Sequence, residues 1–243
     1  IMSKKKFYAI KNTKQIVTTW DECQNIVKGM SGAVYKSFKT EAEAQDFLVD
    51  TPVKTAPKTI EVVDYVADNG IKGTITVAED INPFNLELTP SGTIYAVDGS
   101  FNADTKVYGA GIAQYDRTEY VMSTKRISGN RPEFASARNV AGEVVAFATA
   151  IAMAVEKRQN EITIICDYEG DFRWAAPKSV KVNNVACWGN KKGTPIAEYH
   201  AKAMDYAKKN GIKTINFIWV RGHKGVESNE LVDNLAKAAC GLI

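Results

Sequence analysis

Four acidic residues stand at positions in the sequence from which their carboxylates could act together. Asp98 and Asp167 each close an apolar, strongly β-forming run, and Glu143 opens a nearly all-apolar helical stretch. Asp233 belongs to a later helical stretch, three residues after Glu230 and therefore on the same helix face. Strand ends project side chains from a rigid frame, and ligand sites of open α/β sheets favour such ends. The four carboxylates are therefore candidates for one shared site.

Each of these acids alone has an ordinary structural explanation. The helix dipole, for example, favours a carboxylate such as Glu143 where a helix opens. As a group they indicate chemistry, because clustered carboxylates repel one another unless a hard cation neutralises them. Oxygen ligands select Mg²⁺ or Mn²⁺ rather than zinc. Two such ions, about 3.5–4 Å apart, can activate water and stabilise the leaving oxygen of a phosphodiester.

The elements that must position these acids form a block that begins near residue 92. Strands are expected over residues 93–97, 108–115, 119–127, 162–166 and 215–220, and helices over residues 141–157, 194–210 and 229–239. The first three strands form a meander, and the later strands alternate with helices. This order predicts a mixed sheet covered by helices.

A second, smaller block precedes it over residues 1–50. Short strand-like runs alternate there with two S/T-x-x-E capping boxes, at residues 19–22 and 40–43, and each box opens an amphipathic stretch. The pattern then stops, because residues 50–58 contain two prolines and no periodicity, which is typical of a linker. We therefore predict a small α/β domain over residues 1–50, a linker over residues 51–91 with a possible helix at residues 61–66, and a larger domain over residues 92–243.

Composition narrows the function classes without choosing one. Hydrophobic residues make up 45% and charged residues 24% of the 243 residues, so the chain is neither disordered nor fibrous. Residues 1–60 carry ten lysines against six acids, whereas residues 61–90 carry one lysine against six acids. This is either chance variation in surface charge or the sign of two polyanion-binding modules joined by an acidic segment.

The cysteines and the hydropathy of the sequence indicate in which compartment the protein is expected to function. Its four cysteines lie far apart and form no C-x-x-C pair, so we expect free thiols in the reducing cytoplasm and no zinc knuckle. No apolar run approaches the roughly 20 residues of a membrane span, and no hydrophobic stretch follows the basic N-terminus. We expect neither a membrane association nor an obligate protein partner.

Four motifs resemble, in order, those of type 1 ribonuclease H, which cleaves the RNA strand of RNA/DNA hybrids. They are YAVDGS at residues 95–100, RNVAGE at 138–143, CDYEG at 166–170, and VRGHKG at 220–225 followed by NELVD at 229–233. Residues 1–50 separately resemble the small hybrid-binding, viroplasmin-like domain that precedes this nuclease in many members. FYA at residues 7–9, TWDEC at 19–23 and YKSF at 35–38 carry that second resemblance.

The resemblance implies a ribonuclease H-like fold, with a mixed five-stranded sheet and flanking helices. It implies that Asp98, Glu143, Asp167 and Asp233 bind two Mg²⁺ ions, for which Mn²⁺ substitutes. Asp98 and Asp233 would hold the ion that activates water, and Asp98, Glu143 and Asp167 the ion on the leaving side. His223 matches a mobile-loop histidine that assists proton transfer and product release; without the family match it could be an ordinary loop residue. His200, between Glu198 and Lys202 in a helix, is expected to be a solvated surface residue.

The resemblance also suggests substrate contacts, with departures from the family pattern. The expected contacts are Ser100, Arg138, Asn139, Lys191 and Lys192 in the nuclease block, and Tyr8, Trp20, Tyr35 and Lys36 in the hybrid-binding block. Tyr168 and Glu169 stand where Ser and Gln are common, and Ser37 replaces a family lysine. The three aromatic residues of the small block could alternatively be core residues, although so small a domain can hardly bury them all.

We therefore predict a metal-dependent endoribonuclease specific for RNA/DNA hybrids, leaving 5′-phosphate and 3′-hydroxyl ends. Two rivals remain at this point: a catalytically inactive hybrid-binding protein, and a DNA nuclease of the same fold. The complete set of acids with His223 argues against the first, and the N-terminal signature argues against the second.

Overall fold

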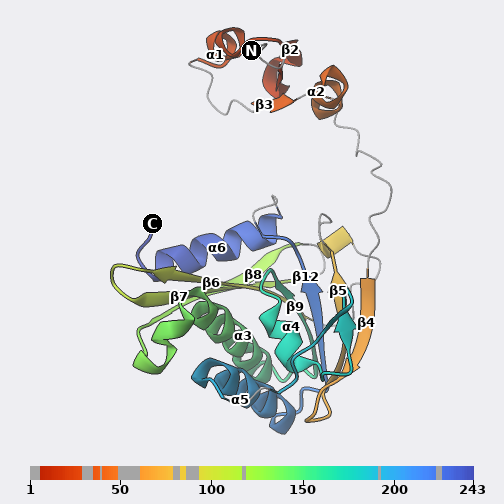
Figure 1. The fold of residues 1–243 in the computed structure, drawn as a ribbon, viewed down its shortest axis with the longest axis vertical. Coiled ribbons are helices and arrows are strands. Elements are labelled where there is room, and N and C mark those ends of the chain that lie inside the picture. Colours follow the sequence, from red (N-terminus) through yellow and green to blue (C-terminus); the bar gives the residue numbers. More distant parts are fainter. Residues whose placement is uncertain are drawn as a thin grey trace. The chain divides into compact units, whose positions relative to one another are not determined.

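The computed structural model describes most of the chain, and Figure 1 shows its course. The described residues are 6–28, 35–38, 40–48, 61–78, 83–85, 93–116, 119–190, 193–222 and 226–243. They fall into two compact units, residues 1–57 and residues 58–243. Each unit has its own sheet.

The N-terminal unit is a small antiparallel sheet with two helices. Its elements are β1 (Phe7–Ile10), a 3₁₀ turn (Lys11–Thr13), β2 (Gln15–Val17), α1 (Trp20–Val27), β3 (Tyr35–Phe38) and α2 (Glu41–Leu48). β1 is the central strand, in the order β2-β1-β3. The predicted capping box at α1 is confirmed, since Thr19 Oγ1 accepts from the Glu22 backbone and the Glu22 carboxylate accepts from the Thr19 backbone. The second predicted box depends on the Glu43 side chain, which lies outside the described residues.

The larger unit is built on a seven-stranded mixed sheet in the order β4-β5-β12-β9-β6-β7-β8. The strands are β4 (Glu61–Val66), β5 (Lys72–Val77), β6 (Thr93–Asn102), β7 (Val107–Tyr115), β8 (Val121–Gly129), β9 (Glu161–Cys166) and β12 (Thr214–Trp219). β6, β7 and β8 form the predicted antiparallel meander, and β9 runs parallel to both β6 and β12. The predicted mixed α/β fold is confirmed, and two strands are added to the expected five.

Those two added strands correct the predicted linker. β4 and β5 form an antiparallel hairpin, and β5 pairs in parallel with β12, so residues 61–78 belong to the sheet and residues 61–66 are not helical. Tyr65 is buried, and its hydroxyl donates to the Ile215 carbonyl at 2.8 Å. At Gly73, an added Cβ would lie 1.8 Å from the same carbonyl oxygen, so only glycine allows this close approach.

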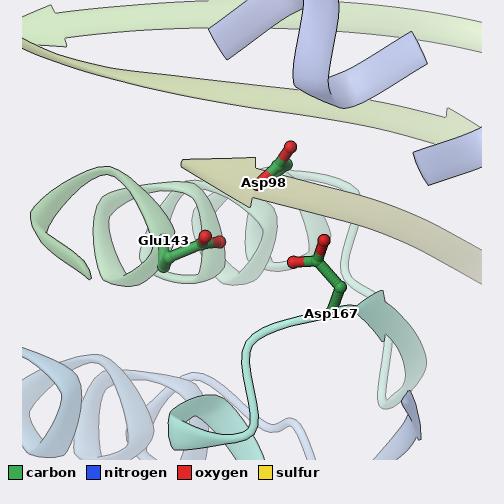
Figure 2. A group of neighbouring side chains, drawn as sticks. All are labelled: Asp98, Glu143 and Asp167. Carbon is green, nitrogen blue, oxygen red and sulfur yellow. The ribbon is translucent and has the colours of Figure 1, made fainter. Parts of the chain in front are cut away.

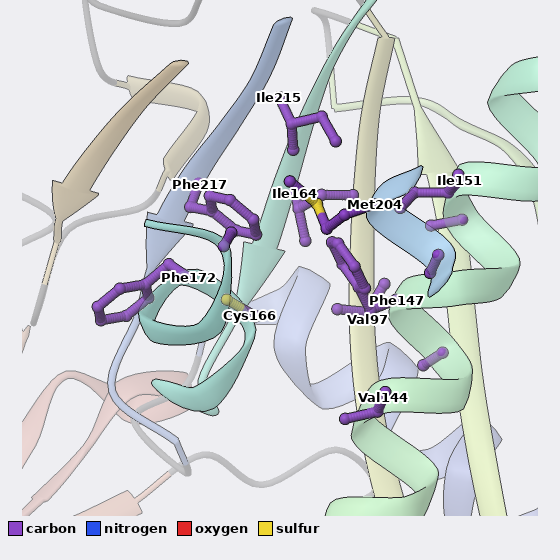
Figure 3. Packing of buried hydrophobic residues seen from close by; sticks show 14 of the residues in the cluster. Val97, Val144, Phe147, Ile151, Ile164, Cys166, Phe172, Met204, Ile215 and Phe217 are labelled. Carbon is purple, nitrogen blue, oxygen red and sulfur yellow. The ribbon is translucent and has the colours of Figure 1, made fainter. Parts of the chain in front are cut away.

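Helices cover both faces of the sheet (Figure 1). They are α3 (Asn139–Glu156), α4 (Gly170–Ala175), α5 (Pro195–Lys209) and α6 (Glu227–Ala239), with 3₁₀ turns at Pro83–Asn85 and Pro132–Ala137 and a small hairpin of β10 (Lys181–Val182) and β11 (Val185–Ala186). Alternation along β6 separates two cores: Tyr95 and Val97 pack with α3 and α5, whereas Ile94 and Ala96 pack with α6. Figure 3 shows the first of these cores, with Phe147 beside Val97.

α3 is long and apolar enough to span a membrane by length and composition, with a mean hydropathy of 1.4 over 18 residues. In the structure, 61% of that stretch is buried inside the protein. It packs on β6 and β7 and against α5. α3 is thus the core helix of the larger unit.

His200 corrects a second prediction, because it is buried in α5 and not solvated. Its ring stacks on Phe147 with centroids 4.5 Å apart, and its Nε2 lies 2.9 Å from the Asp171 carbonyl oxygen. Burial lowers the pKa of His200 to about 4, so the ring is neutral at pH 7. The buried residues of α5 follow helical spacing (Ile196, Ala197, His200, Ala203, Met204 and Ala207). That periodicity, which the sequence shows, places His200 on the inner face.

Candidate active site

Three of the four predicted acids meet where β6, α3 and β9 come together (Figure 2). Asp98 lies within β6, which continues to Asn102 beyond the predicted strand end. Glu143 lies in α3, and Asp167 directly follows β9. One carboxylate oxygen from each lies within 4.8 Å of the others. The predicted convergence of these three side chains is therefore present in the structure.

Glycines let α3 approach the sheet closely enough to bring Glu143 to Asp98. An added Cβ at Gly99 would lie 2.1 Å from the Glu143 backbone nitrogen, and one at Gly142 would lie 2.2 Å from the Gly109 carbonyl oxygen. Both contacts are with backbone atoms, so a larger residue would push the helix away. The glycines beside two of the acids in the sequence thus have a geometric role.

Burial and mutual repulsion make the ionised form of these acids unfavourable. Burial first, and then the charge of Asp167, raise the pKa of Asp98 to about 7, although the Gly99 N–H donates to its Oδ1 at 2.7 Å. Burial, followed by Asp98 and Asp167, raises the pKa of Glu143 well above its usual range. Glu143 Oε2 is buried without a hydrogen-bond partner in the described part of the chain. An oxygen-only donor set with an orphaned buried oxygen fits a hard divalent cation.

Asp233 lies beside this group but is not part of it. Its Oδ2 accepts from Lys237 Nζ at 2.6 Å, one turn along α6. It still acts on Asp98 electrostatically, since its charge contributes to the raised pKa of that residue. A fourth ligand at this position thus stays a prediction.

Several residues around Asp167 were missed at the sequence level. Trp219 Nε1 donates to the Asp167 carbonyl at 2.8 Å, and Asn229 Nδ2 donates to Asp167 Oδ2 at 3.1 Å. An added Cβ at Gly222 would lie 2.5 Å from the same Oδ2. Asn229 and Gly222 fall inside the motifs quoted above, which is the signal that marks them.

Asp171 is a further buried acid that the sequence analysis did not single out. Neither of its carboxylate oxygens has a hydrogen-bond partner within the described ranges. Burial, and then the charges of Asp167 and Asp98, raise the pKa of Asp171 well above its usual range. Asp171 lies in the short helix α4. In the sequence, only its position four residues after Asp167 indicates that it lies near the other acids.

Of the five predicted substrate contacts in the nuclease block, Ser100, Arg138 and Asn139 are described, whereas Lys191, Lys192 and the predicted catalytic His223 are not. Ser100 is half-buried two residues beyond Asp98, and Arg138 and Asn139 are exposed at the start of α3. Arg138 has φ of 52°, uncommon for a residue with a side chain, and its guanidinium lies 5.9 Å from the Phe101 ring centroid. His223, Lys191 and Lys192 lie outside the described residues.

In the N-terminal unit, the three predicted aromatic residues form a row. The ring of Trp20 lies 5.8 Å from Tyr8 and 5.9 Å from Tyr35, and Trp20 and Tyr35 are 44% and 42% exposed. Such exposure is not that of core residues. Lys36 does not join the row: its Nζ lies 5.7 Å from the ring of Phe38, on the other face of β3, whereas Ser37 pairs in register with Tyr8.

Two protein-family models match the chain. The model described as the ribonuclease H1 N-terminal domain matches residues 6–48, and the RNase H model matches residues 90–241. The first match lies within the N-terminal unit and the second within the larger unit, whose strands β4 and β5 lie outside both matches.

Three curated proteins named ribonuclease H are similar to the chain. The protein of Saccharomyces cerevisiae is 24% identical over 254 residues, which cover 95% of this chain and 68% of the relative. That of Acidiphilium cryptum is 38% identical over 99 residues (37% and 57%), and that of Crithidia fasciculata is 46% identical over 54 residues (21% and 11%). The chain thus spans about a tenth of the Crithidia relative and just over half of the Acidiphilium one.

Solved structures with similar folds include ribonucleases H1. The enzyme from Halobacterium salinarum is 15% identical with a TM-score of 0.46, covering 62% of this chain and 98% of its own. LC11-RNase H1 in complex with an RNA/DNA hybrid is 17% identical with a TM-score of 0.45, covering 61% and 99%.

Proposed function

The chain belongs to the ribonuclease H family, and from this premise we propose that it is an endoribonuclease that hydrolyses the RNA strand of RNA/DNA hybrids. The observation that carries the proposal is the meeting of Asp98, Glu143 and Asp167 within 4.8 Å on three different elements. An inactive member of the family would have no need to keep the buried carboxylates of Asp98 and Glu143 beside Asp167, because burial and mutual repulsion make their ionised forms unfavourable in the folded state.

Asp98, Glu143 and Asp167 would hold Mg²⁺, with Asp233 completing a site for two ions. Bound there, two such ions would supply activation of the attacking water and stabilisation of the leaving oxygen, a reaction that would leave 5′-phosphate and 3′-hydroxyl ends. Asp233 first has to exchange its contact with Lys237, an i,i+4 pair on a partly exposed helix face. Such pairs contribute little, about 0.3–0.5 kcal/mol, so this exchange is easy. We assign proton transfer at the leaving group to His223.

Ser100, Arg138 and Asn139 would select the substrate. They lie along the end of β6 and the start of α3, directly beside the acids that carry out the chemistry. Hydroxyl and amide side chains can hydrogen-bond to the 2′-hydroxyl and the base edges of an A-like minor groove, which separates RNA from DNA. The exposed guanidinium of Arg138 suits a phosphate.

The N-terminal unit would bind the hybrid through its aromatic row. Exposed aromatic faces stack on nucleic acid, and the neighbouring lysines attract phosphates. Ser37 occupies the position opposite Tyr8, at one end of the row, and Lys36 would reach phosphates from the other face of β3. The four unpaired, buried cysteines favour a reducing compartment, so we place the enzyme in the cytoplasm.

Cleavage assays test the proposal directly. Labelled RNA/DNA, RNA/RNA and DNA/DNA duplexes are incubated with the full chain and with Asp167→Asn, in Mg²⁺, in Mn²⁺ or in EDTA. We expect only the hybrid to be cut, only by the unmodified chain and only with metal. Cleavage of DNA/DNA would favour a DNA nuclease, and binding of the hybrid without cleavage under all conditions would favour an inactive hybrid-binding protein.

A further inference from the structure

The backbone around Asp167 is held by β12, which is the last strand along the chain and lies next to β9 in the sheet. The Val220 N–H donates to the Cys166 carbonyl at 3.0 Å, and Trp219 Nε1 donates to the Asp167 carbonyl at 2.8 Å. Asp167 directly follows β9, so it lies outside the strand pairing that fixes the residues of β9. These two bonds fix where its side chain starts and leave open where its carboxylate points.

Two other residues determine the position of one carboxylate oxygen. Asn229 Nδ2 donates to Asp167 Oδ2 at 3.1 Å, and the Cα of Gly222 lies so near that a Cβ there would be 2.5 Å from the same atom. One residue holds Oδ2 by a hydrogen bond, and the other leaves just enough room for it. Both come from segments that follow β12, on either side of residues 223–225.

Asn229 is itself firmly placed. It is 3% exposed in the first turn of α6, and its backbone N–H donates to the Val226 carbonyl at 2.9 Å. α6 is seated on the sheet through buried Val232 and Ala236, and an added Cβ at Gly111 would lie 2.1 Å from the Val232 carbonyl oxygen. The amide of Asn229 therefore cannot follow Asp167 if that side chain turns away.

Electrostatic repulsion among the three carboxylates explains why the contact between Asn229 and Asp167 would matter. Asp167 is only partly buried, whereas Asp98 and Glu143 are 6% and 4% exposed, so Asp167 is the one acid of the three with solvent to turn to. In the absence of a cation, rotation away from the other two carboxylates lowers the energy of the group. A fixed N–H donor on Oδ2 opposes that rotation.

We propose that Asn229 is a positioning residue, whose amide holds the Asp167 carboxylate in the orientation that binds a divalent cation together with Asp98 and Glu143. This inference rests on the proposed function, because it takes Asp167 as a metal ligand. Residues that orient metal ligands typically contribute 10–100-fold to metal affinity or activity.

A purely structural role for Asn229 makes a different prediction. Asn229 Oδ1 is buried without a partner in the described part of the chain, so Asn229→Leu removes an unsatisfied acceptor at similar volume. Replacing a polar side chain by an apolar one of the same shape can be nearly neutral for stability. Positioning therefore predicts weakened metal binding in a variant that still folds, whereas a structural role predicts lost stability with intact metal binding in the folded fraction.

The test is calorimetric titration of the full chain with Mn²⁺ alone, without substrate, on Asn229→Leu and Asn229→Asp. We expect the dissociation constant to rise about 10–100-fold in Asn229→Leu and further in Asn229→Asp, which replaces the N–H donor by a like charge. Asn234→Leu and Asn234→Asp, at an exposed position of the same helix, are matched controls that keep the affinity of the unmodified chain. Hybrid cleavage by Asn229→Leu should recover as Mn²⁺ is raised.

Gly222→Ala provides a second route if either Asn229 variant fails to fold. Its methyl group would lie 2.5 Å from the same oxygen and would displace it, so this variant should weaken Mn²⁺ binding to a similar extent. Unchanged Mn²⁺ affinity in folded Asn229→Leu, or in Gly222→Ala where Asn229→Leu does not fold, would overturn the positioning role and leave the proposed function intact. An unmodified chain that neither binds Mn²⁺ nor cuts the hybrid would overturn both.

Discussion

Replacing Asp98 by Asn should stabilise the metal-free protein, although it removes a proposed metal ligand. Asp98 is 6% exposed, and its pKa is raised from 3.8 to about 7, first by burial and then by the charge of Asp167. The asparagine side chain would have nearly the same shape, and its oxygen could still accept from the Gly99 N–H, as Asp98 Oδ1 does at 2.7 Å. The substitution therefore removes the charge and little else.

The size and sign of the effect follow from proton binding. Between pH 4 and pH 7 the folded protein keeps the Asp98 proton that the unfolded chain has released, so the free energy of unfolding falls as the pH rises. The loss is absent below pH 4 and complete above pH 7. The difference of about three units between the pKa of Asp98 in the folded protein and in the unfolded chain corresponds to about 4 kcal/mol. Asp98→Asn carries no ionisable group there, so its advantage should be about 2 kcal/mol at pH 5, where only the first part of the loss has occurred, and about 4 kcal/mol at pH 8.

Urea denaturation in EDTA at pH 5 and pH 8 measures this advantage. Asp104→Asn, at an exposed turn position, is the matched control and should leave the midpoint unchanged at both pH values. Mg²⁺ should then stabilise the unmodified chain more than Asp98→Asn, because a ligand bound only by the folded state adds to its stability. Equal midpoints at pH 8, or an advantage of the same size at both pH values, would refute the electrostatic reasoning.

Two further predictions concern residues outside the cluster. His200→Phe keeps a ring beside Phe147 but loses the hydrogen bond to the Asp171 carbonyl, so at pH 7 it should lower the free energy of unfolding by about 0.5–1.5 kcal/mol. Because the pKa of His200 is lowered from 6.5 to about 4, the unmodified chain should also lose stability as the pH falls from 6.5 to 4, and urea midpoints of His200→Phe should show less of this loss. Trp20→Ala should weaken binding of the full chain to a hybrid by about 1–3 kcal/mol in anisotropy titrations at two salt concentrations. Unchanged affinity at both would remove the aromatic row from the binding surface.

The parts of the fold that sequence reasoning predicted are those with a local signal. β6, β9 and β12 each contain a mostly apolar, β-forming run, and the acids stand beside glycines whose role in close packing the structure shows. The meeting of Asp98, Glu143 and Asp167 could be inferred because each sits at a fixed point of a recognisable element. Asn229, by contrast, contacts Asp167 across 62 residues of sequence; its motif marks the residue, but no local pattern predicts that contact.

The β4–β5 hairpin was missed for a related reason. Its run of β-branched residues could form a strand anywhere, but its place is set by contacts such as the one between Tyr65 and Ile215, 150 residues apart. The proline-rich stretch before it favoured a linker, and the acidic charge of residues 61–90 strengthened that interpretation. The charged neighbours of His200 in the sequence, Glu198 and Lys202, favoured an exposed position, whereas its spacing from the apolar residues of α5 places it on the buried face.

The hairpin leads to a final prediction, that a chain starting at residue 58 keeps a working nuclease unit and a chain starting at residue 92 does not. β5 pairs with β12 along its length, and Ala78 N–H donates to the Trp219 carbonyl at 2.8 Å, so the shorter chain leaves β12 as an open edge. It also removes buried Ile71 and Ile75 from the core; truncation of one such side chain alone typically costs about 2–5 kcal/mol, out of a total of about 5–15 kcal/mol for a domain. β12 carries Trp219 and leads to Gly222, so its loosening should reach Asp167 and with it the metal site.

Thermal unfolding and Mn²⁺ titration of the two truncated chains decide the matter, with Ile75→Ala in the full chain as a milder test of the same packing. We expect the chain from residue 58 to match the full chain in both measurements. The chain from residue 92 should unfold at a lower temperature and bind Mn²⁺ more weakly. If both truncated chains unfold at the same temperature and bind Mn²⁺ alike, the five remaining strands form a complete domain without the hairpin. The boundary predicted at residue 92 would then be the functional one, although β4 and β5 belong to the sheet.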